Sequence, residues 1–223
     1  MKPGKQFSTR IFVLWIGMFL MIHVNAQSIL ALSKQDHTLA IVEASTLKVK
    51  AKIPVGEDPH EVIASTDGKT AYVSIYGGGR LHTINVIDLT AQKRLDDIDT
   101  KPLFGPHGLV FSNNQLWFTV EGSKAIARYD PSSKKIEWAM GSGEDRTHMI
   151  YVSSDGKKIY TTNVASGTVS IFQTAAAPPK NAQKNNMQPQ ENWEQTRINV
   201  AKGAEGFDVS PDGVELWTAS AED

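Results

Sequence analysis

Four segments of the chain can be laid over one another, and this internal repetition limits the possible fold more than any other feature. The segments open at His60, His107, His148 and Glu205, which stand 47, 41 and 57 residues apart. Each opening residue is followed by four residues that are biased toward apolar side chains. Short β-rich runs between turn residues, repeated with a period in the forties, are typical of β-propeller blades.

The four copies share residues at fixed offsets. A serine follows each opening residue by five positions: Ser65, Ser112, Ser153 and Ser210. Three copies continue with Asp-Gly (67–68, 155–156 and 212–213), whereas the second has Asn-Asn (113–114) in a turn two residues shorter. Asp-Gly predicts a tight hairpin, because glycine adopts positive φ cheaply and aspartate bonds its own backbone. An aromatic residue begins each next strand and predicts a core layer between blades: Tyr72, Trp117, Tyr160 and Trp217.

This pattern predicts an all-β fold, a β-propeller of four-stranded blades, of which the chain supplies about four. We expect blades at about 28–55, 56–100, 101–143 and 144–202, and an incomplete blade at 203–223. The long spacing before Glu205 is explained by an insertion at 173–192 that is rich in Ala, Pro, Asn and Gln. Its composition predicts a flexible surface loop.

The repeats resemble a known family. Residues 65–74 (STDGKTAYVS), 153–163 (SSDGKKIYTTN) and 210–218 (SPDGVELWT) resemble the YVTN-type β-propeller repeat. The third blade, with GPHGLVF at 105–111, is more similar to the virginiamycin B lyase and gluconolactonase type of propeller. The resemblance implies a seven-bladed ring of about 28 strands. The sequence pattern contains only 17 strands. We therefore expect that the chain is a fragment or a truncated product and forms an incomplete ring.

The first 26 residues predict a removable signal peptide. Lys2, Lys5 and Arg10 precede an apolar run at 11–24, and a small residue, Ala26, stands at the expected cleavage site. The run is about 14 residues long, which suits a signal peptide and is too short to span a bilayer. We therefore expect a periplasmic or secreted protein whose mature part has no transmembrane segment.

Composition excludes several function classes. Residues 27–223 contain 20 Lys and Arg against 24 Asp and Glu, a net charge of −4. A mildly acidic chain without basic clusters is not expected to bind nucleic acid. The chain has no cysteine, which rules out disulfides, thiolate metal sites and a thiol nucleophile.

His60, His107, His148 and Glu205 are the candidate site residues, because each opens the innermost strand of its predicted blade. Inner strands line the central channel, so these side chains should form an arc at its mouth. Three imidazoles and a carboxylate could hold a divalent metal, bind an anionic ligand or transfer protons. The same register also fits a structural role, in which the polar side chain bonds a loop of the neighbouring blade.

Acidic residues precede two of the histidines, Glu57 and Asp58 before His60 and Glu144 and Asp145 before His148. They could orient an imidazole, bind a hard cation such as Ca²⁺, or simply solvate the loops. Glu61, directly after His60, is expected to point to the other side of the strand.

The sequence leaves two functions open. The first is a non-catalytic exported module that binds a small-molecule ligand or an envelope protein partner with its channel mouth. The second is a lactonase- or lyase-type enzyme that uses the His/Glu arc, alone or around a metal. The resemblance gives only the general location of a site, because no complete catalytic motif is present.

Overall fold

The protein folds into antiparallel β-sheets joined by short turns. The computed structural model describes residues 27–175 and 192–222. The predicted signal peptide at 1–26 lies outside the described residues, as does most of the predicted insertion loop. Gln173 and Thr174, which were expected in that loop, belong to a strand, and Gln173 pairs with Glu194. In the described part, the helices are short 3₁₀ turns, and none is long or apolar enough to cross a bilayer.

The described strands form five sheets. The first contains β1 (Ser28–Ser33), β2 (Thr38–Glu43) and β3 (Val49–Pro54). The second contains β4 (Pro59–Ala64), β5 (Thr70–Ile75), β6 (Thr83–Asp88), β7 (Lys93–Arg94) and β8 (Ile98–Asp99). The third contains β9 (Pro106–Ser112), β10 (Gln115–Val120), β11 (Ala125–Asp130) and β12 (Lys135–Gly141). The fourth contains β13 (Thr147–Val152), β14 (Lys158–Asn163), β15 (Thr168–Thr174) and β16 (Trp193–Asn199). The fifth contains β17 (Ala204–Val209) and β18 (Leu216–Ser220).

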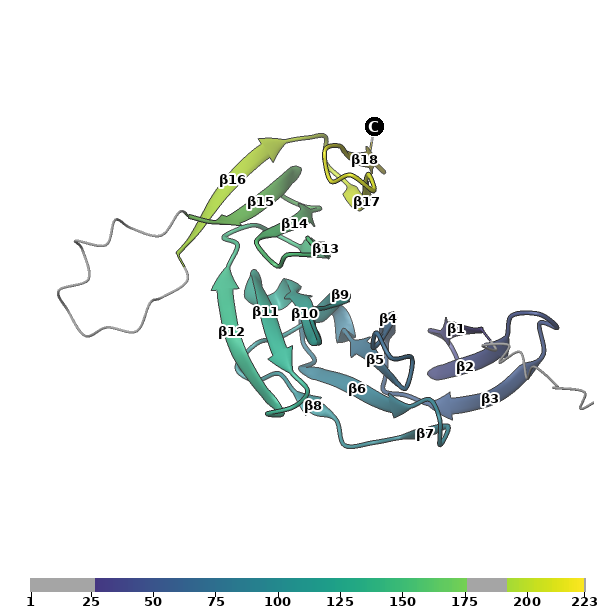
Figure 1. The fold of residues 1–223 in the computed structure, drawn as a ribbon. Coiled ribbons are helices and arrows are strands. Elements are labelled where there is room, and N and C mark those ends of the chain that lie inside the picture. Colours follow the sequence, from purple (N-terminus) through teal and green to yellow (C-terminus); the bar gives the residue numbers. More distant parts are fainter. Residues whose placement is uncertain (1–26, 176–191, 223) are drawn as a thin grey trace, which may run out of the picture.

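The sheets follow one another along an arc (Figure 1). The strands β4, β9, β13 and β17 lie on its inner side, and β3, β7, β12 and β16 lie on its outer side. Neighbouring inner strands contact each other along the arc. The predicted all-β, propeller-like architecture with four-stranded antiparallel sheets is therefore confirmed. The described residues contain 18 strands instead of the expected 17, because the outer strand of the second sheet is split into β7 and β8, both of which pair with β6.

The Asp-Gly turns work as their chemistry predicts. In the β4–β5 hairpin, Asp67 Oδ1 accepts hydrogen bonds from the Ser65 hydroxyl (2.6 Å) and the Lys69 N–H (3.1 Å). Gly68 follows with φ of 68°, in the region that favours glycine. The β9–β10 hairpin reverses in two residues instead, with Asn113 and Asn114 at φ of 53° and 59°, which asparagine tolerates better than most residues.

The inner strands β4, β9, β13 and β17 each carry a β-bulge directly after their start. The ladder shifts between Pro59 and Val62 in the second sheet, and corresponding shifts occur in the third, fourth and fifth sheets. In each case two residues, of which the first is the opening residue of the repeat, face one residue of the next strand. The histidines thus occupy positions where the regular alternation of side chains is broken.

A hydroxyl group from the second strand fills the gap at three of these bulges. Ser74 Oγ, Thr119 Oγ1 and Thr162 Oγ1 accept the N–H of the second bulge residue, at 3.0, 2.8 and 3.4 Å. The two threonines also donate across to the next sheet. Thr119 bonds the carbonyl oxygen of His148 (2.5 Å), and Thr162 bonds that of Glu205 (2.7 Å). Each threonine therefore ties the inner strands of two successive sheets together.

Apolar side chains fill the spaces between successive sheets. Tyr72 of the second sheet packs with Leu116 and Phe118 of the third, and Trp117 of the third packs with Phe172 of the fourth. Tyr72, Trp117 and Tyr160 are buried, as expected for a layer between blades. The expectation is wrong for Trp217, which is 61% exposed. Among the described residues, no sheet follows β17 and β18 to cover this ring.

We predict that Thr119→Val lowers the free energy of unfolding by about 2–3 kcal/mol, because it leaves the Gly108 N–H and the His148 carbonyl without their shared partner. Thr119→Ser is the matched control, since it keeps the hydroxyl and removes only a methyl group. Urea denaturation of both variants measures the difference. Equal stability of the two variants would show that the bridge contributes little.

Candidate functional site

The three repeat histidines come together on the inner side of the arc, where β4, β9 and β13 lie side by side (Figure 1). The ring centroids of His60 and His107 are 4.6 Å apart, and those of His107 and His148 are 4.0 Å apart. The three rings therefore form one continuous column, called here the histidine cluster. His107 stands at its centre and is 3% exposed.

A tyrosine and a glutamate from the second strands complete the cluster. Tyr76 directly follows β5, and its ring centroid lies 4.6 Å from His60 and 5.0 Å from His107. Glu121 directly follows β10; one of its oxygens contacts Nδ1 of His148, and the other accepts the hydroxyl of Tyr76. The buried carboxylate of Glu121 thus connects Tyr76 to His148, the ring at one end of the column.

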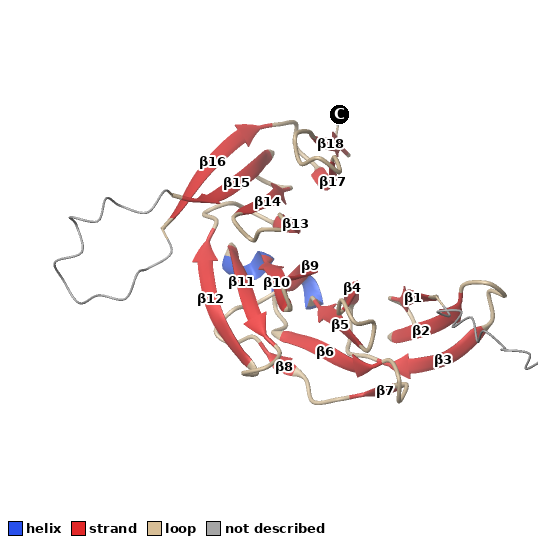
Figure 2. Cartoon of the chain, viewed as in Figure 1, coloured by secondary structure: helices blue, strands red, loops and turns tan. Residues whose placement is uncertain are grey.

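Glu121 is fixed in place by close packing of backbone. Its N–H donates to the carbonyl of Gly105 (2.8 Å), at the start of the short 3₁₀ helix η2 (Glu121–Ser123). The next residue, Gly122, lies against Gly79 of the short helix η1 (Gly77–Gly79), and a Cβ at Gly122 would stand 2.2 Å from the Gly79 oxygen. Only glycine fits there, so the two helical turns, drawn in blue in Figure 2, pack tightly and hold the carboxylate at the cluster.

Burial and hydrogen bonding set the charge state of Glu121. Burial by itself raises the pKa of this carboxyl group, but the hydrogen bonds from His148 and Tyr76 outweigh it, and the net pKa is lowered. Burial, together with the bond to Glu121, raises the pKa of Tyr76 to about 12. Glu121 is therefore an anion, and Tyr76 is a neutral donor, at neutral pH.

His107 differs from the other two histidines in having a buried nitrogen atom without a hydrogen-bond partner. Nδ1 of His107 is buried and makes no hydrogen bond. Burial, followed by the nearby His148, lowers the pKa of His107 to about 3, so the ring is a neutral imidazole. Buried polar atoms are nearly always paired, and an exception calls for an explanation such as a ligand.

Two cationic side chains flank the cluster. Lys34, directly after β1, lies 2.8 Å from Asp58 Oδ1 and 3.1 Å from Nε2 of His60. Arg146, before β13, lies between Glu121 (3.8 Å) and Glu205 (3.7 Å). Each end of the histidine column therefore carries a cation that is paired with carboxylates.

The structure places the fourth predicted residue at the margin of the site. The Glu205 side chain is 53% exposed, and its carboxylate faces Arg146. The group whose ligand atoms all lie within 4.8 Å of one another consists of His107, Glu121 and His148. The repeat register thus brings the three histidines together, but the carboxylate nearest to them comes from another position.

Sequence reasoning missed Glu121, although the repeats contain a signal for it. Lys34, Tyr76 and Glu121 each stand directly after a strand that is equivalent in its sheet, and each contacts a histidine of the following sheet. In the repeats, Tyr76 and Glu121 follow the aromatic residues Tyr72 and Trp117 by four positions. Because the residue type changes from copy to copy, no pattern draws attention to the position.

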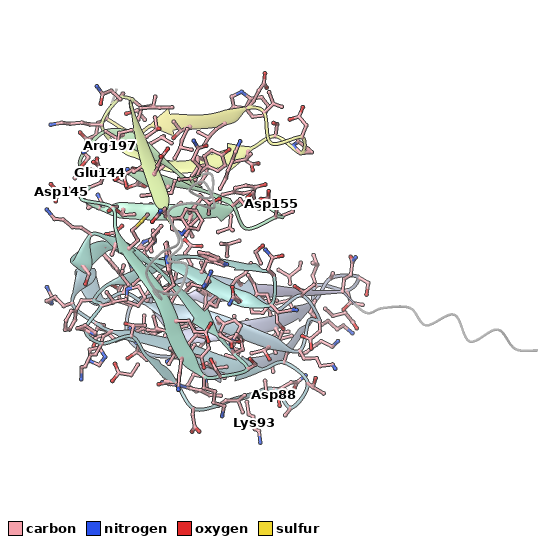
Figure 3. All side chains as sticks on the ribbon, turned by 60° about the vertical axis from the view of Figure 1, so that its left-hand side comes forward. Asp88, Lys93, Glu144, Asp145, Asp155 and Arg197 are labelled. Carbon is pink, nitrogen blue, oxygen red and sulfur yellow. The ribbon has the colours of Figure 1, made fainter. Side chains whose placement is uncertain are left out.

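Of the acidic loop residues, only Asp58 lies at a cluster imidazole, with Oδ1 at 3.5 Å from Nδ1 of His60. Glu144 instead accepts hydrogen bonds from Arg197 (3.1 Å; Figure 3) and Thr168 (2.6 Å), and Asp145 pairs with Lys124. Glu144 therefore links strands β15 and β16 of the fourth sheet through these hydrogen bonds and does not orient His148.

Glu61 occupies the second position of the bulge in β4, where its N–H donates to Ser74 Oγ. Burial raises the pKa of its carboxyl group, and the charge of His148, two sheets away, acts in the opposite direction. The bulge at His60 and Glu61 breaks the alternation that the sequence argument assumed.

Comparison with known proteins supports the fold and leaves the function open. No protein-family model matches the chain, and no curated protein matches its sequence. The structure is similar to hydrazine synthase from Kuenenia stuttgartiensis, with a TM-score of 0.66 and 19% identity over 86% of this chain and 58% of that one. It is also similar to a functionally unknown protein from Desulfotomaculum acetoxidans (TM-score 0.65, 16% identity, 86% and 59% covered) and to U3-55K (0.63, 13%, 82% and 51%).

At these identities the likeness concerns the fold alone, and it agrees with a β-propeller-like architecture. The chain spans less than two thirds of the length of each of these three structures.

We predict that His107→Leu raises the free energy of unfolding of the ligand-free protein by about 1–2 kcal/mol, because it removes a buried nitrogen that has no partner. His82→Leu is the control; it breaks a pair with the exposed Asp99 and keeps an apolar side chain beside Phe104, so it should change stability by less than about 0.5 kcal/mol. Urea denaturation measures both. A clear loss of stability in His107→Leu would instead assign the ring a structural role.

We also predict a pH effect at Glu144. Burial raises the pKa of this carboxyl group, but bonds from Thr168 and Arg197 lower it below its ordinary 4.5. Its contribution to stability is therefore complete above about pH 4.5 and is lost as the pH falls through the lower folded-state value. Glu144→Gln should cost about 1–3 kcal/mol at pH 7 and progressively less toward pH 3. Thermal unfolding across this range checks it; a cost that does not change with pH would contradict it.

Proposed function

We propose that this chain is part of an exported, YVTN-type β-propeller of the cell envelope that binds a small polar ligand at the histidine cluster. The Ser-x-Asp-Gly repeats and the N-terminal charged and apolar segments support the family and the export. The position of the cluster on the inner side of the arc supports the site, since channel mouths are where such folds bind ligands.

One observation carries the proposal: the buried Nδ1 of His107 has no hydrogen-bond partner. Leaving such an atom unpaired costs about 1–3 kcal/mol. Natural proteins keep costly groups of this kind mainly where function needs them. A bound ligand that supplies a donor or an electron-pair acceptor would satisfy the nitrogen.

The burial of His107 favours a small ligand over a protein partner. A residue that is 3% exposed offers no surface on which a macromolecule could dock. The neighbouring groups can recognise a polar molecule, because both signs of charge are present: Lys34 and Arg146 are cations, and Glu121 is an anion. A protein partner could contact only the margin of this site.

A specific contact favours a lactonase- or lyase-type enzyme as a second function. Glu121 contacts Nδ1 of His148, an arrangement that orients an imidazole and leaves its Nε2 for proton transfer. Arg146 lies beside the same carboxylate and could hold an anionic group of a substrate. In this function His148 is the general base, and Glu121 orients it.

We predict that a panel of small polar compounds, including succinate, gluconate and glucono-δ-lactone, contains a ligand that raises the melting temperature of the wild-type protein. At a hundredfold excess over Kd, the ligand should stabilise the protein by about 2.7 kcal/mol. His107→Leu should abolish this shift, and His82→Leu should retain it. If the ligand raised the melting temperature of His107→Leu by the same amount, the histidine cluster would not be the binding site.

The same compounds separate the two functions. Hydrolysis of glucono-δ-lactone by the wild-type protein, lost in Glu121→Gln, would favour the enzyme. Binding without turnover would favour the binding module.

A further inference from the structure

The side chains of His107, Glu121 and His148 offer two imidazole nitrogens and one carboxylate oxygen that all lie within 4.8 Å of one another. Metal–ligand bonds of about 2.0–2.2 Å place two ligand atoms of a tetrahedral site roughly 3.4 Å apart. Adjustments of little more than about 1 Å would therefore bring the three atoms around one ion. Both histidines lie on inner strands, and Glu121 lies on the tightly packed turn after β10, so the group is held on ordered backbone.

We propose that His107, Glu121 and His148 bind one divalent first-row transition-metal ion. This inference rests on the proposed function and names the ligand class that completes the cluster. The site differs from the arc that the repeat register predicts, since Glu121 takes the place of Glu205 and His60 is not a ligand.

The donor set determines which ions the site accepts. Imidazole suits Zn²⁺, Fe²⁺, Co²⁺ and related ions, and two histidines with one carboxylate recur in catalytic zinc and non-haem iron sites. Ca²⁺ requires six to eight oxygen ligands, which this trio does not provide. Three protein ligands leave at least one coordination position open for water or for a polar ligand.

The unpaired nitrogen of His107 is an independent observation on a residue of the same group. Its Nδ1 is buried, with no donor or acceptor opposite it. A coordinate bond to an ion would use the lone pair that no protein group uses. A purely structural histidine at the centre of the column would be expected to hydrogen-bond a neighbour.

Groups around the trio are placed to support a bound ion. The Tyr76 hydroxyl donates to Glu121 and fixes the carboxylate, as outer-shell partners of metal ligands do. The contact between Glu121 and Nδ1 of His148 would give way to coordination of both side chains. Arg146 opposes a cation, but it is 47% exposed and also pairs with Glu205, so its charge is partly neutralised and can move outward.

His60 is excluded because both of its nitrogens are engaged. Nε2 lies 3.1 Å from the ammonium group of Lys34, and Nδ1 lies 3.3 Å from the carbonyl oxygen of Asp58. The same ring packs at a tilt against His107 and so forms one wall of the site.

Titration of the metal-free protein with Co²⁺ and with Zn²⁺ tests the proposal. Calorimetry gives stoichiometry and affinity, and the visible spectrum of Co²⁺ reports nitrogen and oxygen coordination. We expect one equivalent of either ion to bind. His107→Gln, Glu121→Gln and His148→Gln should each weaken binding at least about 100-fold, because even outer-shell changes cost about 10–100-fold.

Two controls make the result specific. His82→Gln removes an imidazole that is paired with the exposed Asp99, and it should leave the affinity within about threefold of wild type. Glu205→Gln tests whether Glu205 is a ligand, as the predicted arc requires. We expect this variant to bind metal like wild type, because the proposed ligands are His107, Glu121 and His148. Circular dichroism verifies that each variant is folded, and His107→Leu serves as the second variant at the central position.

Three results would overturn the proposal: folded wild-type protein that binds no stoichiometric metal, Glu121→Gln that binds as well as wild type, or Glu205→Gln that loses binding as His107→Gln does. Failure of the metal site is distinguishable from failure of the proposed function. If no metal binds, a small ligand that still binds wild-type protein, and not His107→Leu, would preserve the proposed function without the metal site.

Discussion

Thr119 and Thr162 each use one hydroxyl group for two bonds, and this arrangement links the sheets at the inner side of the arc. The oxygen accepts an N–H from the bulge of its own sheet, and its proton goes to a carbonyl of the next sheet. The bulge leaves backbone groups that the ladder cannot pair, so an unfilled gap would be costly. The same bulges carry the histidines, and the bond that joins two sheets therefore also sets the spacing of the imidazoles.

The crowding of ionisable groups at this place follows from the geometry of the arc. Inner strands approach one another more closely than outer strands do, so side chains from three sheets meet in a small space. Most of them are satisfied by charge pairing, as in Lys34 with Asp58 and Arg146 with Glu121. His107 lies at the centre, where burial keeps the ring neutral and leaves a nitrogen unpaired. A group that weakens the ligand-free fold but suits a ligand is typical of a binding site.

The repeat pattern predicted much of the fold and part of the candidate site. The Asp-Gly turns, the aromatic layer at Tyr72 and Trp117, and the meeting of three histidines follow from the spacing of the copies. The pattern gave Trp217 the same place as the other three aromatic rings, but burial of that ring depends on a neighbouring sheet, and none follows β18 among the described residues. It also pointed to Glu144 and Glu205 as carboxylates near imidazoles, whereas both pair with arginines. The partners of these side chains come from other strands and sheets, and the order of residues in the sequence does not show which strands lie next to one another.

The sequence by itself determined the all-β class, the periodic sheets and the register of the histidines, because turn chemistry and strand patterning are local properties of the chain. Tertiary structure alone decided that Glu121, and not Glu205, reaches the cluster. It also decided that the central imidazole has an unpaired nitrogen. Both facts depend on bulges and on glycine contacts between loops that are 43 residues apart, Gly79 and Gly122. Contacts of this kind arise only when successive sheets pack against each other.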